Sequence, residues 1–224
     1  MSTRRVLYIG NRNYSSWSLR AWLALRFMEM GFDTERLPLD TPEFRDRIRG
    51  ISAAGRVPVL HDGDRVIWDS LAICEYAAER AAHGSWPEDE RLRAHARCAV
   101  SEMHSGFGAL RSALPMNIRA RRRVERDAEV ERDIERMVGL WCEALTMHTG
   151  RAGWLYGERS IADAFFAPVL LRFVTYGVPV PELCQPWMQQ LLADADLQAW
   201  CDEARAETEI VEADEAGEPL ETGT

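Results

Sequence analysis

The first third of the chain alternates short apolar runs with helical patterns. Val6–Ile9 is a β-branched and aromatic run, which predicts a strand. Ser18–Met30 is apolar nearly all round, which predicts a helix buried on several sides. Thr34–Leu39 predicts a second strand, and Pro42–Arg49 predicts a short polar helix with proline at its first position. These segments form a strand–helix–strand–helix order.

A hairpin and a further helix are expected next. Val57–His61 and Arg65–Trp68 are short hydrophobic runs on either side of an Asp-Gly pair, which favours a hairpin. A helix is predicted to begin at Ser70. A crossover unit makes a parallel strand pair and a hairpin makes an antiparallel one. The order therefore predicts a mixed sheet with a thioredoxin-like arrangement, which is an α/β fold.

The remainder of the chain reads as helical. Residues 89–113 predict one long helix, and residues 119–146 predict a second whose interleaved charges favour pairing along an exposed face. Ser160 and Asp163 have the spacing of a capping box, which predicts the start of another helix. Residues 187–209 predict the final helix, followed by a solvated tail.

This change in pattern predicts two domains. The first covers residues 1–83 and is the thioredoxin-like α/β unit, and residues 84–87 read as a linker. The second covers residues 89–224 and is all-helical, with an acidic tail at its end.

Charge and composition exclude several classes of chemistry. The chain has 224 residues and a formal charge of −9, and all 27 basic residues are arginine. Schiff-base enzymes, P-loop NTPases and protein kinases need a lysine, so these classes are excluded. Residues 202–224 contain nine acidic residues and one arginine, so most of the negative charge is local. The near-neutral remainder offers no basic footprint for nucleic acid.

The cysteines and the hydropathy suggest a compartment. Five cysteines are widely spaced without a CxxC pair, which argues against a zinc site or a disulfide framework and suggests a reducing environment. The N-terminus has too short an apolar stretch for a signal peptide. No run reaches the roughly 20 apolar residues of a membrane span. We expect a cytoplasmic protein without a membrane segment.

Four segments carry a family resemblance. In their order along the chain, they are similar to the serine-bearing loop, the cis-proline stretch, the acid–serine motif and the helical-domain capping box of the cytosolic glutathione transferases. The segments are NYSSWSLRAWLAL (Asn13–Leu25), GRVPVL (Gly55–Leu60), WDSLAICEYAAE (Trp68–Glu79) and GERSIADAFFAPVL (Gly157–Leu170). A further segment, SEMHSGFGALRSALPMN (Ser101–Asn117), resembles a bacterial subgroup of the serine-type enzymes.

The resemblance implies a residue that stabilises the glutathione thiolate. A free thiol has a pKa of about 8.5, and a hydroxyl donor at a helix N-terminus lowers it. Ser15 is the first candidate, since it lies between the first predicted strand and helix. Ser16, Asn13 and Tyr14 remain alternatives, and a helix cap is the structural alternative for the serines. The loop contains no cysteine, which argues against the disulfide-exchanging branches.

The resemblance also implies how glutathione is held. The backbone of Val57, before a cis-Pro58, would pair with the cysteinyl backbone of glutathione, and Arg56 would approach its glycine carboxylate. Ser70, at a helix N-terminus, would bind the γ-glutamyl carboxylate, and Asp69 would bind the ammonium. Plain helix capping is the alternative role for these two residues.

The electrophile pocket is expected on the first long helix. Met103, Phe107 and Arg111 recur at helical spacing, and Trp17 lies beside the candidate serine. Such a stripe is often core, but an arginine on an apolar face needs a partner, either a structural one or an anionic or carbonyl substrate.

The predicted function is that of a glutathione S-transferase, a detoxification enzyme that transfers the glutathione thiolate to small hydrophobic electrophiles. Glutathione is the co-substrate, no metal is expected, and family members are usually homodimers. Two alternatives remain: a glutathione-dependent isomerase of the maleylacetoacetate type, and a non-catalytic binding or regulatory protein.

Overall fold

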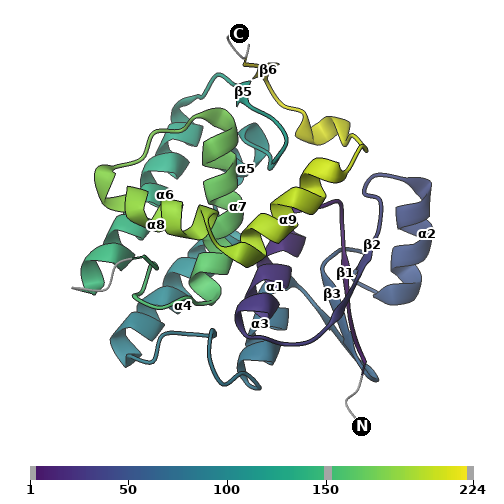
Figure 1. Cartoon of the computed structure of the whole chain (residues 1–224). Coiled ribbons are helices and arrows are strands. Elements are labelled where there is room, and N and C mark those ends of the chain that lie inside the picture. Colours follow the sequence, from purple (N-terminus) through teal and green to yellow (C-terminus); the bar gives the residue numbers. More distant parts are fainter. Residues whose placement is uncertain (1–3, 149–152, 221–224) are drawn as a thin grey trace.

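A mixed four-stranded sheet organises the N-terminal part of the chain. The computed structural model describes residues 4–148 and 153–220 (Figure 1). The strand order is β2-β1-β3-β4, with β1 parallel to β2 and antiparallel to β3. The strands are β1 (Arg5–Ile9), β2 (Asp33–Arg36), β3 (Val59–Asp62) and β4 (Arg65–Trp68). The predicted thioredoxin-like arrangement is confirmed, including the hairpin, whose turn lies at Gly63-Asp64.

Helices cover both faces of this sheet. The helix α2 lies on one face, and α1 and α3 lie on the other, between the sheet and the C-terminal helices (Figure 1). Side chains alternate along β1: Leu7 and Ile9 face the main core, whereas Tyr8 packs with Ile48 of α2. The three helices are α1 (Ser16–Phe27), α2 (Pro42–Ile51) and α3 (Ser70–Ala78).

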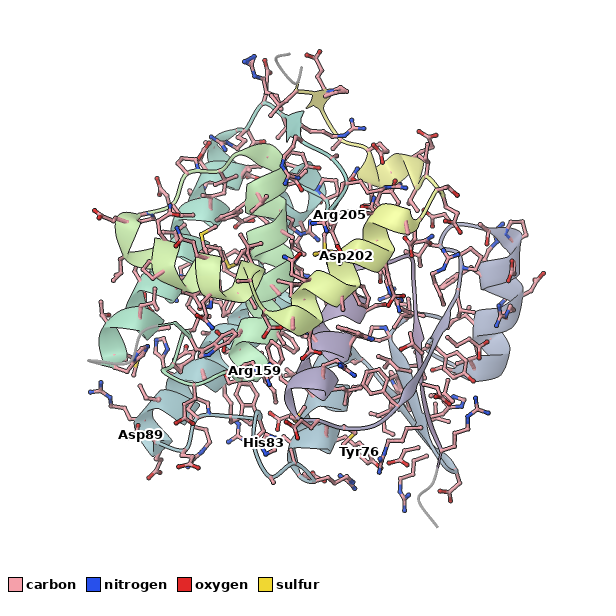
Figure 2. All side chains as sticks on the ribbon, in the orientation of Figure 1. Tyr76, His83, Asp89, Arg159, Asp202 and Arg205 are labelled. Carbon is pink, nitrogen blue, oxygen red and sulfur yellow. The ribbon has the colours of Figure 1, made fainter. Side chains whose placement is uncertain are left out.

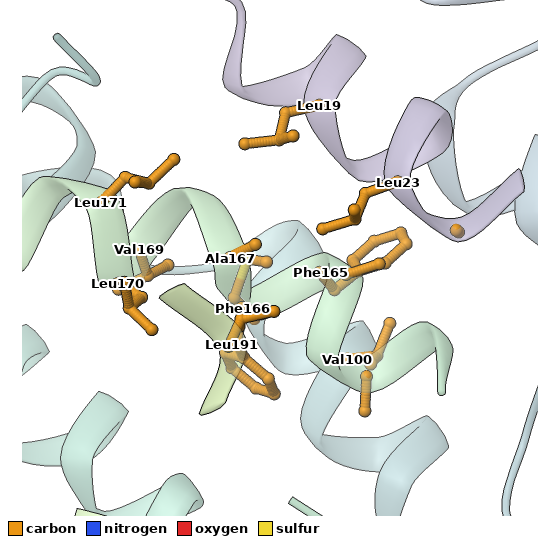
Figure 3. Packing of buried hydrophobic residues seen from close by; sticks show 14 of the residues in the cluster. Leu19, Leu23, Val100, Phe165, Phe166, Ala167, Val169, Leu170, Leu171 and Leu191 are labelled. Atoms are coloured by element: carbon orange, nitrogen blue, oxygen red, sulfur yellow. The ribbon is translucent and has the colours of Figure 1, made fainter. Parts of the chain in front are cut away.

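The helix α1 is the central element of the molecule. Ten of its twelve residues are buried, as its apolar sequence predicts. It packs against α3, α7 and α9, and Leu23 lies beside Phe165 of α7 (Figure 3). At its end, Arg159 lies over the ring of Phe27 at 4.6 Å and pairs with Asp194 at 3.2 Å (Figure 2). One continuous core therefore joins the sheet region to the helices.

The C-terminal part is helical, as predicted. The capping box at the start of α7 is present, with Ser160 as N-cap and Asp163 bonded back to it. The helix continues through Pro168 to Tyr176. The helices are α4 (Glu90–Ser105), α5 (Gly108–Ala113), α6 (Ala128–Met147), α7 (Ile161–Tyr176), α8 (Gln185–Leu192) and α9 (Ala195–Ala206), with single 3₁₀ turns at Glu182–Cys184 and Glu212–Asp214.

Two long helices expected from the sequence are interrupted. The predicted helix over residues 89–113 is wrong as a single element, since Phe107 has a left-handed backbone with φ of 61°. This conformation ends α4 and starts the separate short helix α5. The predicted helix over residues 187–209 is also divided, because Asp194 caps a new helix with its side chain.

The charged run after residue 119 is not helical at its start. The helix α6 begins only at Ala128, where Asp127 accepts hydrogen bonds from two backbone N–H groups. Before it, β5 (Arg122–Arg123) pairs with β6 (Glu218–Pro219). Arg122 also binds carbonyl groups and a carboxylate of the C-terminal segment. Arg119 and Arg122 therefore bind the C-terminal segment, whereas Arg126, Arg132 and Arg136 pair with acidic residues of α6. The solvated tail is expected over residues 216–224, and of its described residues, 217–220 are exposed, although Glu218–Pro219 forms β6.

The remaining expectations concern membranes and domain limits. Within residues 4–148 and 153–220, no helix combines the length and apolarity that a membrane-spanning segment needs. The division at residues 83 and 89 stays a prediction.

Candidate functional site

The loop before α1 brings three hydroxyl groups together. Ser15 is the N-cap residue, and its side chain makes no capping hydrogen bond. Instead its Oγ lies 2.7 Å from Ser18 Oγ, which in turn accepts the N–H of Gly10 at 3.1 Å. The Oγ of Ser16 accepts a hydrogen bond from Arg172 Nη2 at 3.0 Å. Both candidate serines line one cavity.

The two other candidates in this loop are held by distant segments. The amide of Asn13 donates to Asn117 at 2.9 Å and accepts the N–H of Arg119 at 2.9 Å. The Tyr14 hydroxyl donates to Glu215 at 2.6 Å and accepts from Arg119 at 2.9 Å. Burial and the Glu215 hydrogen bond raise the pKa of Tyr14. These hydrogen bonds connect the loop to distant segments, and Tyr14 lines the same cavity as Ser15 and Ser16.

The predicted cis-proline is present. The Val57-Pro58 peptide bond is cis, as the resemblance implied. The strand β3 begins only at Val59, so the backbone of Val57 lies outside the sheet ladder. Val57 and the exposed side chain of Arg56 line the cavity around them.

The Asp69-Ser70 pair forms the N-terminus of α3. Asp69 has φ of 73° and accepts the N–H groups of Leu71 and Ala72 at 2.9 and 3.2 Å. Its other oxygen lies 3.3 Å from His104 Nε2. Burial opposes ionisation of Asp69, but the His104 contact and the N–H groups outweigh it and lower its pKa. Helix capping is thus present, and the carboxylate is charged near neutral pH.

Ser70 has an unused hydroxyl. It is buried, and its Oγ has no hydrogen-bond partner among the described residues. Ser70 lines a cavity of about 660 Å³ together with Asp69, Val57 and Pro58. A buried hydroxyl without a partner is unfavourable, so a ligand in this cavity would satisfy it.

A second cavity adjoins the first. It measures about 410 Å³, and both are lined by Trp17, Arg56 and Val57. Ser15 and Ser16 belong to the second cavity, whereas Asp69 and Ser70 belong to the first. The serine loop therefore faces one cavity and the acid–serine motif faces the other, with Trp17 between them.

The predicted electrophile-pocket residues separate into two groups. Trp17 and Arg111 line the second cavity. Met103 and Phe107 are buried in the main core and do not line it. The guanidinium of Arg111 donates to the carbonyl groups of Met103 and His104, so the structure supplies a partner for it.

Several residues of this region were not anticipated from the sequence. Arg172 on α7 and Asp214 near the C-terminus both line the second cavity. Burial lowers the pKa of Arg172 to about 10 and raises that of Asp214 to about 6. Arg172 follows a run of apolar residues in α7, from Ala164 to Leu171, and that position is the signal that could have singled it out. Among the described residues, no group of three or more His, Cys, Asp or Glu could hold a metal ion.

Comparison with known proteins is consistent with this geometry. Residues 14–80 match the family model described as "Glutathione S-transferase, N-terminal domain". A glutathione transferase homologue from Burkholderia gl BGR1 with bound glutathione is similar in structure, with a TM-score of 0.70 and 24% identity. The match covers 91% of this chain and 100% of that one. The chain has the glutathione transferase fold.

Other glutathione transferases share this fold. The enzyme from the Antarctic clam Laternula elliptica has a TM-score of 0.70 at 19% identity, covering 92% of this chain and 95% of its own. A theta-class enzyme from Xanthomonas axonopodis pv. citri with glutathione bound has a TM-score of 0.64 at 22% identity, covering 89% and 97%. These likenesses show the fold, and the family model matches its N-terminal part.

A curated relative is similar over part of its length. A "Probable maleylacetoacetate isomerase" from Caenorhabditis elegans is 34% identical over 106 residues. The match covers 47% of this chain and 49% of that protein, so it spans about half the length of the relative.

Proposed function

We propose that this protein is a serine-type glutathione S-transferase that adds the glutathione thiolate to small hydrophobic electrophiles. The observation that carries the proposal is the first cavity, where the unpartnered hydroxyl of Ser70 and the charged Asp69 lie together with Val57 before its cis-proline. These groups match the polar ends and the extended backbone of a tripeptide.

Glutathione binding follows from the charges at this end of α3. The first N–H groups of a helix favour an anion, so the γ-glutamyl carboxylate would lie at Ser70 and satisfy its hydroxyl. The ammonium of the same residue would pair with Asp69, whose lowered pKa keeps it ionised. The cysteinyl backbone would pair with Val57 as an added strand, which directs the thiol toward Trp17 and the second cavity.

The thiolate would be stabilised by the serine loop. Ser15 lies in the second cavity at the N-terminus of α1, where the helix dipole favours a negative sulfur. The Gly10 N–H donates to Ser18 Oγ, and rotation of the two hydroxyls lets Ser18 donate to Ser15 and Ser15 to the sulfur. Such a chain of hydrogen bonds strengthens the last donor. Ser16 is the alternative donor, since it accepts from Arg172 and keeps its own proton free.

The reaction would take place between the two cavities. The sulfur forms a bond to the electrophilic carbon, and a halide leaves with its electron pair or a conjugated double bond accepts the electrons and then a proton. We also propose that the protein is a cytoplasmic homodimer with a role in detoxification, as is usual for the family it resembles.

A second candidate function has a specific observation in its favour. The similarity to a probable maleylacetoacetate isomerase favours reversible thiol addition to a conjugated acid, followed by elimination after bond rotation. Only half of each chain is matched, so conjugation remains the first proposal.

The test compares wild type, Ser15→Ala and Asp69→Asn. Calorimetric titration measures glutathione binding, and spectrophotometry measures conjugation of 1-chloro-2,4-dinitrobenzene and isomerisation of a maleyl compound. We expect glutathione binding that Asp69→Asn weakens and conjugation that Ser15→Ala slows. Isomerisation without conjugation would favour the second function. Glutathione binding without either reaction over a panel of electrophiles would favour a non-catalytic role.

A further inference from the structure

Three arginines lie around Ser16 and Trp17: Arg20 and Arg172 are buried, and Arg111 is half-buried. The guanidinium carbon of Arg20 lies 4.2 Å from the centre of the indole ring, and that of Arg111 lies 5.0 Å from it. Arg172 donates to Ser16, the residue before Trp17. Burial lowers the pKa of Arg20 well below its usual value, and repulsion from Arg111 and Arg172 lowers it further. The three cations are therefore close enough to repel one another.

None of the three forms an ion pair with a described carboxylate within 4.0 Å. Arg111 and Arg172 donate mainly to backbone carbonyl groups, and Nε and Nη1 of Arg20 have no partner among the described residues. Elsewhere in the chain, by contrast, Arg12 forms an ion pair with Glu203, and Arg122 forms one with Glu215. Asp69 attracts Arg20 and Asp133 attracts Arg111 without forming an ion pair with them. Carbonyl groups orient a guanidinium but do not neutralise it, and incompletely compensated buried charge is unfavourable.

The second cavity gives a ligand access to this charge. Arg56, Arg111 and Arg172 line it, and Asp214 is the one acidic residue among the described lining residues. Asp214 attracts Arg172 only at a distance, since the two form no ion pair within 4.0 Å. The lining therefore has an excess of positive charge, and Trp17 belongs to the same lining.

We infer that the electrophile of this protein carries a carboxylate, which Arg111 and Arg172 bind while its apolar body lies against Trp17. The inference rests on the proposed function for the identity of the co-substrate. A guanidinium presents a planar set of N–H groups that matches a carboxylate, and it remains charged when partly buried. Ser15 lines the same cavity, so the reactive carbon would lie between the sulfur and the arginines.

A matched pair of electrophiles tests the inference. The substrates 4-chloro-3-nitrobenzoate and its methyl ester react alike: the sulfur bonds to the ring carbon, chloride leaves with its electron pair, and the carboxyl group is unchanged. For each substrate, kcat/KM is divided by its uncatalysed rate with glutathione. We expect this corrected value to favour the acid over the ester by about tenfold, which corresponds to 1.4 kcal/mol.

Two variants change the charge in opposite directions. Arg111→Gln should remove most of the preference for the acid, and Arg111→Lys should retain part of it. Asp214→Asn should increase the preference, because a repelling carboxylate is lost from the cavity. Asp214→Asn also keeps the test decisive if Arg111→Gln fails to fold, since it leaves the carbonyl contacts of Arg111 in place. Equal corrected values for acid and ester, or a ratio that folded variants leave unchanged, would overturn the inference.

A binding measurement separates this inference from the proposed function. Calorimetric titration of wild type and Arg111→Gln with 4-chloro-3-nitrobenzoate and its ester needs neither glutathione nor turnover. Preferential binding of the acid by wild type without conjugation would support the anion site and contradict the transferase proposal. Conjugation of the ester alone, with no preferential binding of the acid, would support the transferase proposal and contradict the anion site.

Discussion

The hydroxyl oxygens of Ser15 and Ser18 lie 2.7 Å apart at the start of α1, and the Gly10 N–H points to the second of them. Ser18 is fully buried, whereas Ser15 lines the second cavity. The pair thus connects a fixed backbone donor to a hydroxyl that a ligand can reach.

Ser15→Ala should lower kcat/KM for conjugation by about 10- to 100-fold, because a hydrogen bond to a charged group contributes about 1.5–3 kcal/mol. The pKa of bound glutathione, measured from the pH dependence of thiolate absorbance, should rise. The matched control is Ser16→Ala, which removes a hydroxyl one residue away. A larger effect in Ser16→Ala than in Ser15→Ala would reverse the assignment.

Ser18→Ala should have a smaller effect of the same kind. The variant leaves the Ser15 hydroxyl in place but removes the group that positions it and the acceptor for Gly10 N–H. We expect kcat to fall by roughly 3- to 10-fold, as for loss of a hydrogen bond worth about 1 kcal/mol, with the Kd for glutathione unchanged. Ser18→Thr keeps the hydroxyl and should recover part of the rate. An unaltered thiol pKa in Ser18→Ala would argue that the residue is merely structural.

Asp69→Asn should weaken glutathione binding by about tenfold or more through loss of a charged hydrogen bond. Asparagine tolerates the left-handed backbone and caps helices as well as aspartate does, so α3 should persist. Calorimetry measures the affinity, and circular dichroism checks the fold. An affinity within twofold of wild type would show that the carboxylate serves α3 alone.

Asp163 should be essential for stability and should make it depend on pH. Its carboxylate accepts from Leu155 N, Ser160 N, Ser160 Oγ and Trp187 Nε1 at 2.9–3.2 Å. Asp163→Ala leaves these buried donors without a partner, so the free energy of unfolding should fall by about 3 kcal/mol or more. Urea unfolding measures this change, and Asp202→Ala on the exposed face of α9 is the control (Figure 2).

The pH dependence follows from the same burial. Burial raises the pKa of Asp163 to about 6, although its four donors oppose that shift. An unfolded aspartate has a pKa of about 3.9, so the folded state binds more protons between these values. This contribution to stability is complete below about pH 4 and is lost as the pH rises through about 6. The difference in unfolding free energy between wild type and Asp163→Asn should therefore change in this window and be constant above it.

Glu207 should control the mobility of the serine loop. Its carboxylate accepts the N–H groups of Arg12 at 2.8 Å and Asn13 at 3.1 Å. The two N–H groups bind different oxygens of Glu207, so in Glu207→Gln one of them keeps a weaker, uncharged acceptor and the other faces an NH2 group that cannot accept it. Hydrogen exchange of these two amides should accelerate, and the thiol pKa should rise because Ser15 is less well positioned. Glu212→Gln, an exposed change on the same segment, should leave both unchanged. Unaltered exchange in Glu207→Gln would contradict this role.

The sequence by itself determined the N-terminal fold, because its signals are local. Strand alternation, the Asp-Gly turn and the caps at Asp69 and Ser160 each depend on residues a few positions apart. The positions of Ser15, the Val57-Pro58 bond and Ser70 could be expected for the same reason, together with a family resemblance. Their roles in catalysis stay predictions.

Tertiary structure alone decided which groups meet around these residues. Tyr14 and Glu215 are 201 positions apart, and Ser16 and Arg172 are 156 apart. The pattern of apolar and polar residues along the sequence does not predict such pairs, because hydrogen bonds between distant segments depend on how the whole chain packs. The same reason explains why Arg119 and Arg122 bind the C-terminal segment instead of belonging to a helix. The cluster of Arg20, Arg111 and Arg172 near Ser16 and Trp17 arises in this way, since the three arginines belong to three different helices.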